Sequence, residues 1–201
     1  LVAFGVAGCG NGDPAVAVVN DEEISQAEFN SRIEQMRTAY ESQGMELDDA
    51  TLGQIEEQTL ETMIDETLLT QEATEAGLTP SDDEVDEAME AQTAQFPDEE
   101  SLNEALEGAG LDEEGLRDLI AQQLSIQRYI EAQMEDAGGA EVTDEEIEAL
   151  YEQYSSQTEE MPPLEDIRPQ LEAELQQQQQ GAAVQQIVDD LRESADIEIL
   201  T

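Results

Sequence analysis

Residues 15–29 read AVAVVNDEEISQAEF, and they contain both kinds of secondary structure that we expect in this chain. The run Ala15–Val19 is rich in β-branched valine and stops at an Asn-Asp pair, which predicts a short strand and a turn. Ser25 and Glu28 form the Ser-x-x-Glu pattern of a capping box, which predicts the start of a helix. The apolar residues of that helix recur at steps of four, three and four, giving one stripe: Phe29, Ile33, Met36 and Tyr40.

Helical patterns continue along almost all of the remaining chain. Further capping boxes begin at Ser81, Ser101 and Thr143, and the longest helices are expected over 49–75 and 164–194. We expect other helices from Ser101 to about residue 108 and from Asp112 to about Met134, and a loop over 155–163. The glutamine tract 176–180 is predicted to be a solvated helical face rather than an aggregation-prone segment.

A second short strand is predicted near the other end of the sequence. Residues 197–200 read IEIL, which alternates in the manner of a strand. The two strands are expected to pair with each other, because an unpartnered strand is marginal in water. The sequence therefore predicts a mainly α fold in which N-terminal and C-terminal short strands are paired.

The charge composition excludes several classes of function. The 201 residues contain 52 Asp and Glu but 6 Lys and Arg, a net charge of −46. All six basic residues are arginines scattered singly, so a nucleic-acid partner is not expected. The absence of histidine excludes Ser-His-Asp, Cys-His and His-zinc chemistry. The absence of lysine excludes a GxxxxGK nucleotide loop, and no cofactor or nucleotide is expected.

So acidic a surface needs screening if the chain is to fold. The Debye length falls from about 8 Å at physiological salt to about 3 Å near 1 M, so concentrated salt would suppress the repulsion between carboxylates. An acidic surface without lysine is typical of proteins from halophiles, and we interpret the chain in this way. An acidic protein from an ordinary mesophile is the alternative.

The first nine residues have a different composition from the rest. Leu1–Cys9 is an apolar run that ends in Val6-Ala7-Gly8-Cys9, which resembles the lipobox of bacterial lipoproteins. The resemblance implies that Cys9 becomes the first mature residue and receives lipid, which would anchor the protein to a membrane. A buried free cysteine in an apolar strand is the alternative. No initiator Met or basic n-region is present, so we expect the sequence to begin inside a signal peptide.

These features divide the chain into three parts. Residues 1–8 are expected to be a signal-peptide remnant, 9–14 the lipidated cysteine with its tether, and 15–201 a single domain whose long C-terminal helix (164–194) packs back on the N-terminal part. The expected location is the periplasm or cell envelope. Gly10 after the cysteine favours the outer membrane if the cell has two, because an aspartate there is the usual inner-membrane retention signal. No other segment approaches the 18 apolar residues of a membrane span.

The order of these landmarks resembles a known family. Residues 15–29 resemble the opening of the SurA N-terminal family of periplasmic chaperones, and the lipobox fits the lipid-anchored PrsA-like foldases of the same group. The resemblance spans residues 15–201 and implies ATP-independent binding of unfolded exported or outer-membrane polypeptides. Three later segments resemble the flank before a parvulin domain, the flank after it, and the terminal strand: Val142–Ile147 with Tyr151, Pro163–Leu171, and Ala195–Leu200.

The chain departs from the full foldases at one point. Their parvulin prolyl-isomerase domain lies between these flanks, where this sequence has only a short polar segment between Tyr154 and Met161. Parvulin sites rely on histidines, and this chain has none. The protein is therefore expected not to be an enzyme, although membership of this family could by itself attract a peptidyl-prolyl isomerase label.

Soft and aromatic side chains near helix ends or chain breaks are candidates for binding residues. Methionine adapts to irregular surfaces, which suits promiscuous binding, although most of the six methionines are expected to fill the core. The candidates for a client-facing groove are Met89, Phe96, Tyr129, Met134 and Tyr154. The acidic clusters 82–87 and 98–100 lack EF-hand spacing and are interpreted as solvated faces, so no metal site is expected.

Three functions stay open on the sequence alone. The first is a general holdase for unfolded exported polypeptides, anchored through lipid on Cys9. The second is an envelope lipoprotein that uses the same fold to dock one specific partner. The third is a peptidyl-prolyl isomerase, which the family label suggests but the residues do not support.

Overall fold

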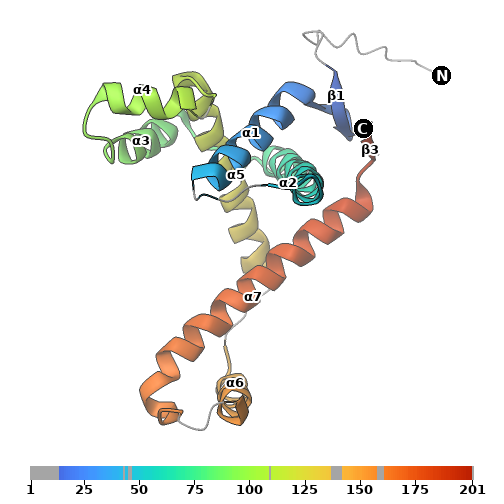
Figure 1. The fold of residues 1–201 in the computed structure, drawn as a ribbon. Helices are drawn as coiled ribbons and strands as arrows, with labels where there is room; N and C mark the ends of the chain where they lie inside the picture. Colours follow the sequence, from blue (N-terminus) through green and yellow to red (C-terminus); the bar gives the residue numbers. More distant parts are fainter. Residues whose placement is uncertain are drawn as a thin grey trace, which may run out of the picture.

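The structure, a computed structural model, is mainly helical with one small sheet (Figure 1). It describes residues 14–42, 44, 47–108, 110–136, 142–157 and 161–200. The strands in these residues are β1 (Ala15–Val19), β2 (Glu22–Ser25) and β3 (Ile197–Ile199). The helices are α1 (Gln26–Ser42), α2 (Asp49–Glu75), α3 (Asp82–Thr93), α4 (Glu99–Gly108), α5 (Glu113–Asp136), α6 (Asp144–Gln157) and α7 (Leu164–Ser194).

The sheet has the order β2-β1-β3, with both neighbours antiparallel to β1. Val18 lies opposite Glu198 and Val19 opposite Ile197, so the predicted pairing of the terminal strands is confirmed. Asn20 closes the β1–β2 turn at a φ of 55°, a left-handed conformation that asparagine tolerates better than most residues. Its backbone N–H donates to the carbonyl of Asp196 at 2.7 Å, which ties the turn to the segment that leads into β3.

The expectation of two strands was incomplete, because β2 is a third. Residues 22–25 were expected to lie in the turn and the helix start, but they pair with β1 before α1 begins. Only Ile24 of this strand is buried, while Glu22 and Glu23 are exposed. Such a short strand with one apolar residue gives almost no alternating pattern in the sequence.

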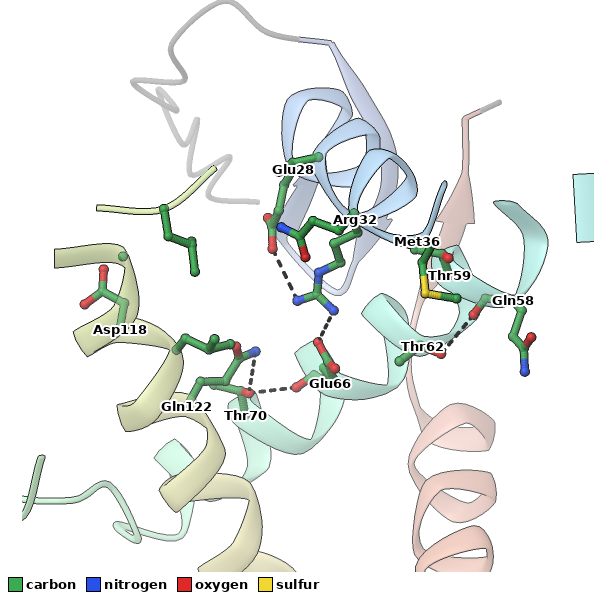
Figure 2. Close-up of a pocket in the computed structure, with 15 residues that line it drawn as sticks. Glu28, Arg32, Met36, Gln58, Thr59, Thr62, Glu66, Thr70, Asp118 and Gln122 are labelled. Carbon is green, nitrogen blue, oxygen red and sulfur yellow. Dashed lines mark hydrogen bonds and ion pairs between the residues drawn. The ribbon is translucent and has the colours of Figure 1, made fainter. Parts of the chain in front are cut away.

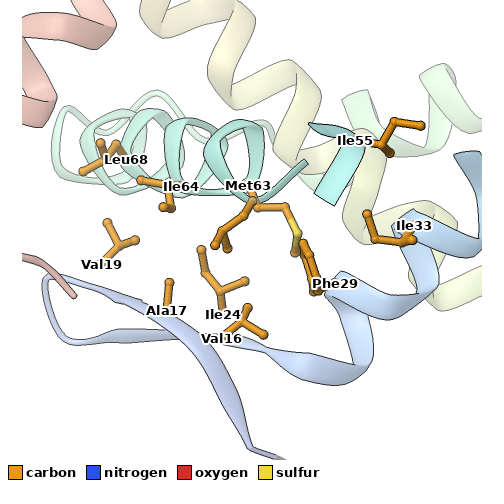
Figure 3. Close-up of a cluster of buried hydrophobic side chains, with 11 residues drawn as sticks. Val16, Ala17, Val19, Ile24, Phe29, Ile33, Ile55, Met63, Ile64 and Leu68 are labelled. Carbon is orange, nitrogen blue, oxygen red and sulfur yellow. The ribbon is translucent and has the colours of Figure 1, made fainter. Parts of the chain in front are cut away.

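The main core lies between the sheet and α2 (Figure 3). Val16, Val19 and Ile64 have 0%, 0% and 2% of their surface exposed, so this seam is closed to solvent. Full burial of one such side chain contributes about 1.5–3 kcal/mol to folding. Phe29 and Ile33 of α1 complete the cluster, as the predicted stripe requires, but Met36 of the same stripe is 40% exposed.

Smaller clusters hold the other helices. One joins α2, α5 and α7 around Tyr129 and Val188, and another joins α3, α4 and α5 around Val85 and Leu116. A third lies between α6 and α7, at the end of α7 remote from β3 (Figure 1). The long helix α7 therefore packs on α2 through its C-terminal part and holds α6 near its N-terminal part.

Arginine joins neighbouring helices throughout the fold. Five of the six arginines form an ion pair with a carboxylate of another element, whereas Arg37 pairs with Glu34 within α1. Each of these cations offsets part of the repulsion between two acidic helices. The pairs are Arg32 of α1 with Glu66 of α2, Arg117 and Arg128 of α5 with Asp86 and Glu84 of α3, Arg168 of α7 with Asp144 of α6, and Arg192 of α7 with Asp65 of α2.

The helix boundaries confirm most of the sequence predictions and correct two. The predicted bounds of α2 and α7 are those of the structure, and capping boxes are present at Ser81 and Thr143. The box predicted at Ser101 is wrong: α4 begins at Glu99, and Asp98 accepts the backbone N–H of Ser101 at 2.9 Å. The predicted loop from residue 155 is also wrong in its first residues, because α6 continues through 157.

The glutamine tract lies within α7, and its residues 176–178 and 180 are exposed, which confirms the solvated face. None of the helices in the described ranges combines the length and the apolar character that a membrane crossing requires.

Candidate functional site

A groove of about 880 Å³ lies between α1, α2 and α5 (Figure 2). All three helices contribute side chains to its walls. The lining includes Glu28, Arg32 and Met36 of α1, Thr62, Glu66 and Thr70 of α2, and Asp118, Leu119 and Gln122 of α5.

Polar links between the helices set the width of this groove. Nη1 of Arg32 lies 2.6 Å from Oε2 of Glu66, which fixes α1 against α2, and Nη2 lies 3.6 Å from Oε1 of Glu28. On the other wall, Nε2 of Gln122 donates to Oγ1 of Thr70 at 3.3 Å and joins α5 to α2. Helix α2 is thus the shared floor, and α1 and α5 are the two walls.

A glycine stands where the turn between α4 and α5 meets α1. Gly110 stands just before α5 at a φ of 67°, a conformation that residues with a Cβ adopt only at a cost. A Cβ at this position would lie 3.1 Å from Oγ of Ser31 on α1. The glycine therefore allows the turn between α4 and α5 to approach α1 closely, and Leu111 then enters the groove lining.

The exposed lining is mainly apolar although most of its residues are polar by type. Threonine methyl groups and glutamine stems add to Met36, Leu111 and Leu119, while amide, hydroxyl and carboxylate groups are distributed among them. Such a surface can bind a polypeptide through apolar contact and still offer hydrogen bonds to its backbone. Within the described residues no group of three or more Asp, Glu or Cys is placed to hold a metal ion.

The groove has the length of a short peptide. Its lining residues on α2 run from Gln58 to Thr70, which is about 18 Å of helix at a rise of about 1.5 Å per residue. An extended polypeptide covers about 3.3 Å per residue, so about five or six residues fit along this floor.

The structure distributes the five sequence candidates over separate places, and none of them lines this groove. Met89 is half-buried against the cluster of α3, α4 and α5, where it lines a smaller cavity of about 370 Å³. Phe96 is half-buried just after α3, and its backbone N–H donates to the carbonyl of Thr93. Met134 is half-buried near the end of α5.

The two tyrosines among the candidates occupy apolar clusters. Tyr129 is 6% exposed among Leu69, Ala73 and Val188, and burial raises the pKa of its phenol, with Glu72 adding to the effect. The Tyr154 hydroxyl donates to Glu174, and this bond is the main cause that raises the pKa of Tyr154. Tyr129 therefore has little surface to offer a ligand in this conformation.

Cys9 lies outside the described residues, so its predicted lipidation stays a prediction. The groove itself was not foreseen, because its lining is mainly threonine, glutamine and glutamate, which carry no apolar signal. Met36 was the available clue: it continues the stripe of Phe29 and Ile33 but lies one turn beyond the main core and opens into the groove.

A family model described as SurA-like N-terminal domain matches residues 1–130, which is well over half of the chain. The chain belongs to the SurA-like N-terminal domain family. The match includes every residue that lines the groove, since the last of them is Gln122. No parvulin domain is matched. No curated protein matches the chain.

The α6 and α7 region of this SurA-like protein lies beyond the matched residues. Its predicted resemblance to the flanks of a parvulin domain therefore rests on the sequence segments alone.

Proposed function

We propose that this protein is an ATP-independent extracytoplasmic chaperone, a holdase, that binds short segments of unfolded exported or outer-membrane polypeptides in the groove between α1, α2 and α5. In this proposal the chain is anchored to the membrane through lipid on Cys9, works in concentrated salt, and has no prolyl isomerase activity.

The observation that supports the proposal most is the groove itself. It is open, it is built entirely from residues of the SurA-like domain, and its exposed lining is mainly apolar. Threonine and glutamine side chains provide many weak, adaptable contacts rather than one fixed geometry, which favours binding of varied sequences. The strongly acidic outer surface would keep a complex with an aggregating client in solution.

The proposal excludes catalysis for reasons that lie in the composition. The chain has no histidine for a parvulin-type site and no lysine for a phosphate-binding loop. We expect no acceleration of cis–trans conversion in a proline peptide assay and no dependence of aggregation suppression on ATP.

An aggregation assay tests the holdase proposal. Several unrelated denatured proteins are diluted into molar KCl with the native protein, with Thr62→Trp, or with Gln176→Trp. Thr62 lines the groove and its hydroxyl donates to the carbonyl of Gln58 in the same helix, so a tryptophan there fills the groove and leaves the Arg32–Glu66 and Gln122–Thr70 links between helices in place. Gln176 is an exposed residue of α7 and provides the matched control.

We expect the native protein and Gln176→Trp to suppress aggregation and Thr62→Trp to lose most of this effect, while circular dichroism shows all three folded. Equal suppression by Thr62→Trp would remove the groove from the mechanism. Failure of the native protein with every client, together with isolation of one stable partner, would replace the holdase by a dedicated docking protein. Mass spectrometry of the native amino terminus tests the anchor separately, since lipidation adds acyl mass to Cys9.

A further inference from the structure

The groove has an excess of negative charge that its one cation does not balance. Glu28, Glu66 and Asp118 contribute three carboxylates to the lining, and Arg32 contributes the single guanidinium. The rest of the lining is uncharged. The lining therefore carries a net negative charge. The inference that follows from this charge rests on the holdase function proposed above.

Arg32 is already engaged by the carboxylates beside it. It bonds to Glu66 at 2.6 Å and lies 3.6 Å from Glu28, and only a quarter of its side chain is exposed (Figure 2). A client carboxylate that approached Arg32 would have to compete with two acids fixed next to it and would meet the repulsion of a third. Acidic client segments are therefore disfavoured.

Asp118 stands on the opposite wall, on α5. It takes part in none of the ion pairs found in the described part of the chain, unlike Glu28 and Glu66. Asp118 and Glu28 thus present carboxylates from two different helices, with the apolar side chains of Leu119 and Met36 also in the lining. A client cation can pair with either acid while neighbouring apolar client residues cover the aliphatic lining.

We propose that the groove selects client segments in which a short apolar run is flanked by arginine or lysine. The occupant is an unfolded polypeptide of about five or six residues within the groove, oriented by contact of its cationic side chains with Glu28 and Asp118. Apolar contact supplies the affinity, and the paired charges supply the preference.

The test must separate this local effect from the attraction that a net charge of −46 exerts on any cation. Three fluorescein-labelled peptides share one central apolar run and differ only in its flanking residues, which are arginine, serine or glutamate. Binding is measured by fluorescence anisotropy at about 1 M KCl, where a screening length of about 3 Å suppresses the distant field but not contact pairs.

Two double variants with the same net charge provide the comparison. Glu28→Gln with Asp118→Asn removes the two groove acids, and Glu104→Gln with Glu172→Gln removes two exposed acids of α4 and α7. Exposed ion pairs typically correspond to about a two- to fivefold change in affinity each. We therefore expect the groove variant to bind the arginine peptide about five- to twentyfold more weakly, and the α4 and α7 variant to bind it as the native protein does.

The outcomes distinguish the charge preference of the groove from the holdase function. An equal loss in both double variants, or equal binding of the arginine and serine peptides by the native protein, overturns the charge preference and leaves the holdase proposal standing. Absence of binding for all three peptides, with no effect of Thr62→Trp on aggregation, overturns both together.

Discussion

Replacement of Arg192 by glutamine tests whether single cations hold the helices of this acidic protein together. Arg192 of α7 donates through Nε to Asp65 of α2 and through Nη2 to the carbonyl of Glu61 at 3.2 Å. Its side chain and that of Asp65 are 30% and 31% exposed, so both groups are partly withdrawn from water. The substitution leaves Asp65 facing an acidic neighbourhood without its partner.

The size of the effect follows from the geometry. An exposed ion pair contributes about 0.2–1 kcal/mol, and a hydrogen bond to a charged group about 1.5–3 kcal/mol. The partly exposed Arg192 contact lies between these cases, so we expect R192Q to reduce the free energy of unfolding by about 1–2 kcal/mol. For a domain of this size each kcal/mol lowers Tm by about 2–4 °C.

Arg37→Gln is the matched control. Arg37 pairs with Glu34 at 3.2 Å within α1, and the two side chains are 45% and 68% exposed. A pair of this kind on one helix contributes about 0.2–0.5 kcal/mol. Both variants change the net charge by one unit, so long-range repulsion rises equally in each.

Thermal unfolding followed by circular dichroism in molar KCl measures both losses. A clearly larger loss for R192Q supports the local argument. Equal losses in the two variants would show that the net charge, and not the contact between α7 and α2, sets the stability.

A pH titration, two glycine variants and a salt series test other parts of the fold. The backbone N–H and hydroxyl of Ser81, with an arginine, lower the pKa of Glu84 from 4.5 to about 2. The stabilisation that the ionised Glu84 carboxylate gives to the folded state is therefore complete above about pH 4.5 and is lost as the pH falls toward 2. An NMR titration of Glu84 should give a midpoint near 2, and S81A should raise this midpoint. Gly110→Ala should destabilise the fold by about 1–2 kcal/mol, because Gly110 has a positive φ. Gly53→Ala should stabilise it by up to about 1 kcal/mol, because Gly53 lies inside α2 with open space around it. Chemical denaturation that gave the same sign for both variants would contradict this. Dialysis from molar KCl to dilute buffer should reduce the helical circular dichroism signal, and an unchanged spectrum would refute the dependence on screening.

The long helices could be predicted from the sequence because several signals agree in them. In α2 the periodic apolar residues end just before Gly77, whose φ of 71° terminates the helix as expected. The start of α4 could not be fixed in this way, because Asp98 and Ser101 are both good capping residues three positions apart. Only the observed bond from the Ser101 N–H to Asp98 decides between them.

The candidate site was harder to predict than the fold. Soft and aromatic residues near helix ends are reasonable candidates for a binding surface, but such residues also fill buried clusters, as Tyr129 does. The groove instead depends on how three helices from distant parts of the chain cross. Thr62 and Gln122 become parts of one surface only after α2 and α5 have packed. Their residue types alone do not predict that they will share a surface.

The pairing of β1 with β3 has a consequence for when the chain can fold. These strands are separated by nearly the whole sequence, so their ladder has a very high contact order and closes late. A chain that emerges N-terminus first, from the ribosome or after export, can form α1 and α2 early, yet Val16 and Val19 lack the protection of their second neighbouring strand until residues 197–199 have also emerged. The arrival of residues 197–199, rather than any local step, thus governs the final closure of the core.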